Sequence, residues 1–210
     1  MHPGSIVAFV MAGCGYRSAP AATVGDAAPP DAGLDGSVAA RDGGSDAASP
    51  RWRYEGGDGG PKSELLCDGL PSWSATDAES EWRLLAAINA ARSVARRCPR
   101  GRSWEADPPL PMNPALRCAA REVAIQIEST GTTEIKFGMF VDRATFDLLL
   151  RWGYHAGIAS REFARADSAD AAVQMWLTDP DLCNGVMIPL TDFGGGVRSD
   201  IWVAIGGYPY

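Results

Sequence analysis

This chain contains few histidines and has no excess of positive charge. Only two of its 210 residues are histidine, and 19 lysines and arginines face 26 aspartates and glutamates, so the formal net charge is −7. Binding to nucleic acid requires clustered Lys and Arg side chains that neutralise phosphates, so we expect no nucleic acid among the partners. An acidic balance of this kind mainly favours solubility.

Several motifs that carry chemistry are also missing. The sequence has no G-x-S-x-G nucleophile elbow, no G-x-x-x-x-G-K-[ST] phosphate loop and no C-x-x-C pair. The run Gly194–Gly196 is not followed by a helical pattern, so it is not predicted to cradle a phosphate. No apolar run reaches about 18 residues, so no membrane-spanning helix is predicted. These absences argue against α/β-hydrolase, P-loop and thioredoxin chemistry.

The N-terminal residues predict export. Residues 5–13 form a short apolar run that ends in Met11-Ala12-Gly13-Cys14, which resembles a bacterial lipobox, although no Lys or Arg precedes it. We predict a signal over residues 1–14, after which acyl chains on Cys14 hold the protein on a membrane at about 0.8 kcal/mol per buried CH₂. The alternative is a chance apolar run with a free Cys14, in which case the protein is secreted.

Residues 15–62 are rich in Ala, Gly, Asp, Pro and Ser and show no apolar periodicity. Such a segment cannot bury enough surface to offset its ordering entropy. We therefore predict a disordered linker over 15–62 and a folded domain over 63–210.

Apolar residues recur at helical spacing in four segments of the folded part, each bounded by a capping residue, a glycine or a proline: 76–98, 113–130, 142–152 and 168–179. Thr76 and Glu79 have the spacing of a capping box. Asn113-Pro114 combines a good cap with proline at the first helical position.

The C-terminal residues instead show a period of two. Ile201, Val203 and Ile205 alternate with other residues, which predicts a strand. Residues 193–197 are its expected hairpin partner, although three glycines weaken that prediction. Helices followed by a terminal hairpin predict an α+β fold, with an antiparallel sheet covered by helices.

The order of these segments resembles the CAP family, also called SCP or PR-1-like. The resemblance rests on segments that follow one another over about residues 78–206: PPLPMNPALRCAAREVA, RWGY, SREFA, AAVQMWLTDPDLCNGVMIP, TDFGGGV and IWVAIGG. No single motif is diagnostic, but their order and spacing together are fairly specific. The resemblance implies a three-layer α-β-α sandwich with a small antiparallel sheet flanked by helices.

The resemblance also implies a degenerate site. CAP proteins often have a cleft with two histidines and one or two acids, a set that can bind a divalent ion or transfer protons. By position, Phe137 and Leu182 replace the histidines, Gly185 replaces an asparagine, and Glu162 is retained. Because a catalytic zinc usually has three protein ligands, we expect no metal and no cofactor. Glu162 is then expected to be a structural carboxylate paired with an arginine or a backbone amide.

We therefore expect a non-enzymatic binding or structural module of the cell envelope, facing the periplasm or the exterior. Its partners would be the membrane, through acylated Cys14, and a lipid, glycan or protein ligand. The alternative is a cryptic hydrolase that pairs Glu162 with His155. Asp179 and Asp181 are nearby acids that could replace the imidazole in that role. A distance beyond about 5–6 Å between Glu162 and His155 excludes their pairing.

Four cysteines remain after Cys14, and an even number in an exported chain predicts disulfides, with three connectivities open. The family resemblance implies a bond between Cys98 and Cys183, which leaves Cys67 for Cys118. Each bond would close a long loop, worth about 4 kcal/mol in the entropy model. A buried free thiol at Cys118 is the alternative.

Overall fold

The computed structural model describes residues 51–55, 60, 64–131 and 142–210, all of which fall in the unit Asp46–Tyr210. The helices are α1 (Ala75–Arg92), α2 (Pro114–Thr130), α3 (Arg143–Arg151), α4 (Ala169–Thr178) and α5 (Pro180–Met187). The strands are β1 (Trp52–Glu55), β2 (Glu64–Cys67), β3 (Arg96–Arg97), β4 (Ser103–Trp104), β5 (Ala156–Arg165), β6 (Asp192–Arg198) and β7 (Ile201–Pro209).

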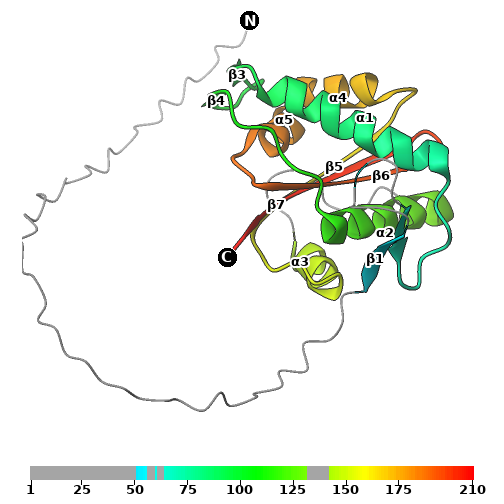
Figure 1. Ribbon diagram of the computed structural model, residues 1–210. Coiled ribbons are helices and arrows are strands. Elements are labelled where there is room, and N and C mark those ends of the chain that lie inside the picture. Colours follow the sequence, from blue (N-terminus) through cyan, green and yellow to red (C-terminus); the bar gives the residue numbers. More distant parts are fainter. Residues whose placement is uncertain (1–50, 56–59, 61–63, 132–141) are drawn as a thin grey trace, which may run out of the picture. The chain divides into compact units, whose positions relative to one another are not determined.

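The folded part is an α+β sandwich of three layers (Figure 1). Its central sheet has the order β5-β7-β6, and both strand pairs are antiparallel. Helices α1, α4 and α5 cover one face, and α2 and α3 cover the other. The layer architecture and the C-terminal hairpin predicted from the sequence are therefore confirmed.

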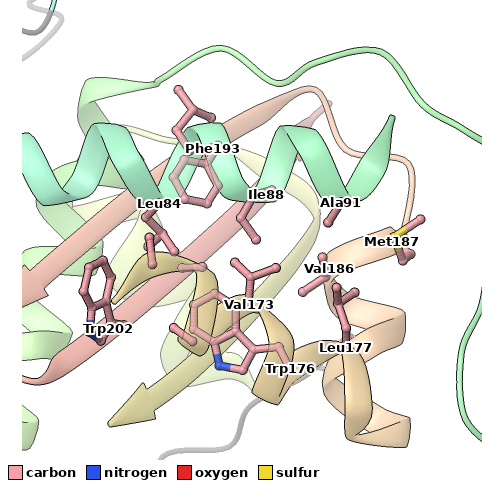
Figure 2. Close-up of a cluster of buried hydrophobic side chains, with 14 of the residues drawn as sticks. Leu84, Ile88, Ala91, Val173, Trp176, Leu177, Val186, Met187, Phe193 and Trp202 are labelled. Atoms are coloured by element: carbon pink, nitrogen blue, oxygen red, sulfur yellow. The ribbon is translucent and has the colours of Figure 1, made fainter. Parts of the chain in front are cut away.

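Each face of the sheet has its own apolar core. The core under α1, α4 and α5 includes Leu84, Ile88 and Trp176, which pack against Phe193 and Trp202 of the sheet (Figure 2). On the other face, α2 and α3 pack on side chains of β7 that point away from the first core. Alternate residues of β7 thus serve opposite cores, as the two-residue period of a strand requires.

The three glycines of β6 have a steric role. A methyl group at Gly194 or Gly196 would overlap the backbone of Leu116 or Ala120, so α2 lies against the strand itself. A methyl group at Gly195 would instead point to the opposite helix layer, 3.3–3.4 Å from atoms of Phe193 and Glu81. The glycine run therefore permits close packing of α2 instead of merely weakening the strand.

The first helix differs at both ends from the prediction. Ser74 is its cap, and its Oγ accepts a hydrogen bond from the Asp77 backbone N–H at 3.0 Å and donates one to the Asp77 carboxylate at 2.8 Å. The capping box of Thr76 and Glu79 is therefore wrong, because the earlier serine already satisfies the free N–H groups of the first turn. The helix ends at Arg92, well before Pro99.

The structure contains elements that the sequence analysis does not predict: strands β1 to β5 and helix α5. Strand β1 pairs with β2 in antiparallel register, from Trp52 opposite Cys67 to Glu55 opposite Glu64. Because β1 lies inside the predicted linker 15–62, the folded part begins earlier than residue 63. Helix α5 begins directly after α4, with Asp179 as its cap.

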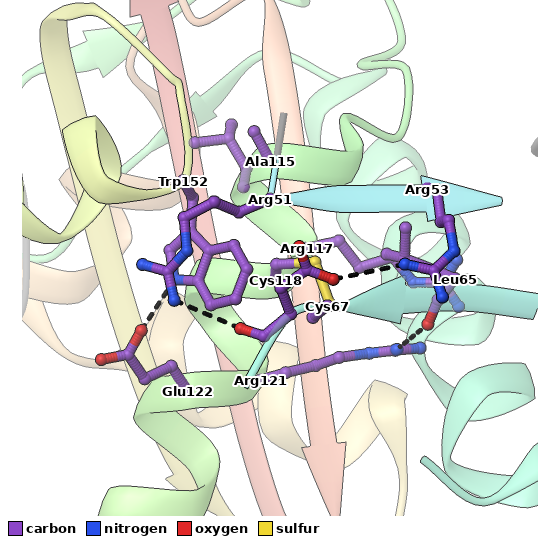
Figure 3. The surroundings of a disulfide bond; sticks show 12 residues. Arg51, Arg53, Leu65, Cys67, Ala115, Arg117, Cys118, Arg121, Glu122 and Trp152 are labelled. Atoms are coloured by element: carbon purple, nitrogen blue, oxygen red, sulfur yellow. Dashed lines mark hydrogen bonds and ion pairs between the residues drawn. A yellow bond between two sulfur atoms is a disulfide. The ribbon is translucent and has the colours of Figure 1, made fainter. Parts of the chain in front are cut away.

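Two disulfides brace this fold. Cys67–Cys118 joins β2 to α2 and is shown in Figure 3, and Cys98–Cys183 joins the turn after β3 to α5. The Cα atoms are 5.7 Å apart in each pair, within the ordinary range for a disulfide. These are the pairs expected from the resemblance, and Cys118 is not a free thiol.

Candidate functional site

Glu162 lies in the middle of β5, and its side chain points into the layer of α1, α4 and α5. It is only 2% exposed. It borders a narrow cavity of about 10 Å³ whose other lining residues are also buried: Ile88, Leu110, Ser160, Gly185, Val186, Leu190, Phe193, Ala204 and Gly206. A cavity of this size has room for about one water molecule. Substrate therefore has no space beside this carboxyl group.

The surroundings of Glu162 keep it protonated. Its burial raises its pKa to about 8, because the hydrogen bond from Ser160 and the charge of Arg161 offset only part of the desolvation. Ser160 Oγ donates to Oε2 at 3.4 Å, and Oε1 has no hydrogen-bond partner in the described part of the chain. Among the described residues, the Glu162 carboxyl group contacts the Ser160 hydroxyl instead of the expected arginine or backbone amide, and neighbouring Arg161 points to the opposite face of the sheet.

The structure brings two of the family-site positions together. Gly185 of α5 lines the same cavity as Glu162, and Leu182 lies one turn earlier on α5 and packs on the same core. Phe137 lies outside the described residues. Ser160 and Glu162 are the only polar side chains among the residues that line the cavity. One neutral acid and one hydroxyl do not fit a divalent ion, which needs several ionised or imidazole ligands.

His155 is exposed and immediately precedes β5, seven residues before Glu162 on the same extended strand. From Ile158, after the register irregularity at the start of β5, to Glu162 the strand alone extends roughly 13 Å at about 3.3 Å per residue. The predicted pairing of His155 with Glu162 is therefore wrong. The His155 ring instead packs edge-on against Tyr210, with 6.3 Å between ring centroids.

Asp179 and Asp181 do not line the Glu162 cavity either. The Asp179 carboxylate accepts hydrogen bonds from the backbone N–H groups of Asp181 and Leu182, at 2.9 and 3.0 Å. Its position reflects the capping of α5. Among residues 51–55, 60, 64–131 and 142–210, no three His, Cys, Asp or Glu side chains are grouped to hold a metal ion.

The sequence analysis misses a buried charge cluster that joins the two helix layers. Glu81 of α1 accepts hydrogen bonds from Arg121 Nε at 2.8 Å and Arg121 Nη2 at 3.0 Å, and also from Arg117 Nε. All three side chains are at most 2% exposed. The four-residue spacing of Arg117 and Arg121, which places both on one face of α2, is the only sequence signal for this cluster.

Cys14 and the rest of the predicted signal lie outside the described residues. Within the residues that the structure describes, no helix has the length and apolar character needed to cross a membrane. The two disulfides indicate an oxidising compartment.

Comparison with known proteins supports the fold. No family model matches this chain, and no curated protein matches it. A crystal structure of an extracellular protein containing an SCP domain from Bacillus anthracis is similar, with a TM-score of 0.51 and 16% sequence identity. The match covers 69% of this chain and 46% of the Bacillus anthracis chain, which is less than half of that protein. At this identity the likeness concerns architecture alone, and the described domain has the SCP fold that the sequence resemblance predicts.

Proposed function

We propose that this chain is an extracytoplasmic SCP-fold module that acts by binding a partner or as a structural part of the envelope, and not by catalysis at Glu162. The observation that carries the proposal is the small volume, about 10 Å³, of the cavity beside Glu162. Its carboxyl group is buried among apolar side chains, and its nearest polar partner is a serine hydroxyl. A general acid needs a substrate within about 3 Å, which this cavity does not admit.

Location outside the cytoplasm is supported by three observations. Two buried disulfides suit an oxidising compartment. The similar Bacillus anthracis protein is extracellular. The Met11-Ala12-Gly13-Cys14 segment resembles a lipobox. In this proposal, acylated Cys14 holds the domain on a membrane, and a lipid, a glycan or another envelope protein is the partner.

A hydrolase is the second candidate, and the raised pKa of Glu162 is the observation that favours it. A carboxyl group that stays protonated near neutral pH can act as a general acid. Catalysis would also require a second polar group and an opening to solvent. The lining of the cavity provides only Ser160 beside Glu162, so we rank this function below binding.

The catalytic question can be tested by comparing Glu162→Gln with Glu79→Gln, which changes an exposed glutamate on α1. Both variants and the wild type would be assayed with fluorogenic ester, peptide and glycoside substrates, with and without Zn²⁺. We expect no turnover above the buffer rate. Turnover that is lost in Glu162→Gln and kept in Glu79→Gln would establish catalysis at Glu162 and refute the proposal.

The anchor is tested separately by mass spectrometry and membrane fractionation. We expect a mature chain that begins at Cys14 and carries acyl chains, and a Cys14→Ser variant that moves to the soluble fraction. Equal membrane retention of the wild type and Cys14→Ser would show that another part of the chain holds it there.

A further inference from the structure

The buried cluster of Glu81, Arg117 and Arg121 contains two guanidinium groups and one carboxylate. Burial raises the pKa of Glu81, and its hydrogen bonds from the two arginines oppose that rise. With Glu81 ionised, the cluster holds one positive charge in excess, inside a chain whose net charge is −7. Tyr54, which borders the cluster, does not offset this charge, because its burial raises the pKa of the phenol and keeps it neutral. A buried charge is costly unless an opposite charge approaches it, so an anion would bind where the cluster borders a hollow, which is at Arg121.

The hydrogen-bond donors of the cluster are only partly used. Arg121 directs Nε and Nη2 to Glu81 and Nη1 to the Leu65 carbonyl oxygen at 2.9 Å. Since a guanidinium has five N–H groups, Arg121 retains donors beyond these three bonds. Arg117 Nη1 is buried and has no hydrogen-bond partner among the described residues.

A hollow of about 290 Å³ lies next to Arg121, between β2 and residues 68–73. Buried Arg121 and Leu65 form its inner part, and exposed Arg53 and Asp68 form its rim, where they pair at 3.4 Å. Figure 3 shows Arg53 and the Arg121 guanidinium on the same side of the disulfide, beside Leu65. Two arginines thus border one space that opens to solvent.

Trp73 forms another wall of this hollow. The Arg121 guanidinium carbon lies 4.9 Å from the centroid of its ring, so the indole helps to fix the guanidinium in place. Trp73 Nε1 has no hydrogen-bond partner in the described part of the chain. The Nε1 atom itself is buried, so the hollow offers an aromatic wall and two arginines.

We propose that this hollow binds a small ligand through a single carboxylate that docks between Arg121 and Arg53. One carboxylate matches the single excess charge and could accept hydrogen bonds from the Nη hydrogens of Arg121 that Glu81 and Leu65 leave unused. A phosphate would bring a second negative charge close to Asp68 and is disfavoured. The volume is at the lower end for ligand pockets, which suits a body the size of a monosaccharide or an amino acid. The site is separate from the Glu162 cavity and holds whether or not Glu162 is catalytic.

The test is a titration of the full-length chain, followed by the ¹⁵N-resolved NMR signals of Trp73 Nε1–H and Arg121 Nε–H at constant ionic strength. Glucuronate is the probe, glucose its uncharged analogue, and acetate and inorganic phosphate the bare anions. The Trp73→Phe variant identifies the Trp73 signal among those of the seven tryptophans. We expect saturable shifts with glucuronate in the millimolar range, none with glucose, and weaker effects with acetate and phosphate.

Two matched variants locate the binding. Arg53→Gln and Arg83→Gln each remove an exposed arginine, 62% and 67% exposed. Arg53 is paired with Glu55 and Asp68, and Arg83 is paired with Glu79. We expect Arg53→Gln to raise the dissociation constant of glucuronate about threefold and Arg83→Gln to leave it unchanged. The proposal is overturned if glucuronate gives no saturable shift, if glucose or either bare anion binds as tightly, or if the two variants behave alike.

Discussion

The burial of Glu162 predicts a pH-dependent stability that one substitution should remove. The unfolded chain ionises this carboxyl group near its ordinary pKa of 4.5, whereas the folded chain does so only near pH 8. The stability due to Glu162 is therefore fully present below pH 4.5 and is lost as the pH rises to about 8. Gln has nearly the shape of the protonated acid and carries no titratable proton, so Glu162→Gln should lack this dependence.

The size of the effect follows from the two pKa values. A difference between 4.5 and about 8 corresponds to about 5 kcal/mol of unfolding free energy, as an order of magnitude. Between these pH values, wild-type stability should fall by about 1.4 kcal/mol per pH unit relative to Glu162→Gln. This loss is comparable to the whole stability of many domains, so the wild type should become markedly easier to unfold in mildly alkaline solution.

The assay is urea denaturation of the wild type and Glu162→Gln at a series of pH values from 4.5 to 8.5. All other titrating groups are common to both proteins, so the difference between their unfolding free energies isolates Glu162. We expect the difference to change steadily in favour of the variant and to level off above pH 8. A difference that stays constant over the range would mean that Glu162 titrates normally and that its cavity is open to solvent.

Three further predictions concern stability and are measured by denaturant unfolding. Gly196→Ala should cost about 3 kcal/mol, because the new methyl group meets the backbone of α2, whereas Gly195→Ala should cost far less; equal losses would contradict the close packing of α2 on β6. Glu81→Gln should cost about 3 to 5 kcal/mol, since it leaves two buried guanidinium groups without a carboxylate, and an effect as small as that of Glu79→Gln would show that the cluster is hydrated. Joint replacement of Cys98 and Cys183 by Ser should cost about 4 kcal/mol, and an unchanged midpoint would show that this bond does not constrain the unfolded chain.

The sequence predicts helices well where local capping residues decide the fold. Asn113 accepts hydrogen bonds from the backbone N–H groups of Ala115 and Leu116, and Ser168 caps α4 in the same way. The same kind of signal is present at Asp179-Pro180, where α5 begins. It is missed because the proline also ends α4, and a helix of eight residues has little periodicity of its own.

The candidate site is less predictable than the fold. Strand β5 carries Ser160, Arg161 and Glu162 at buried positions, so it lacks the apolar alternation that reveals most strands. The resemblance identifies Glu162 as a site position, but the small volume of its cavity depends on Ile88, Leu110 and other residues from distant parts of the chain. Tertiary packing of this kind leaves no periodic signal.

The two disulfides overlap along the chain, because one spans Cys67 to Cys118 and the other Cys98 to Cys183. A protease that cuts the backbone once, anywhere between Cys67 and Cys183, therefore leaves both fragments in one covalent molecule. Around the exposed turn at Arg100, both bonds bridge the cut. Such a nicked protein would keep its mass on a non-reducing gel and separate into two bands only after a reductant is added.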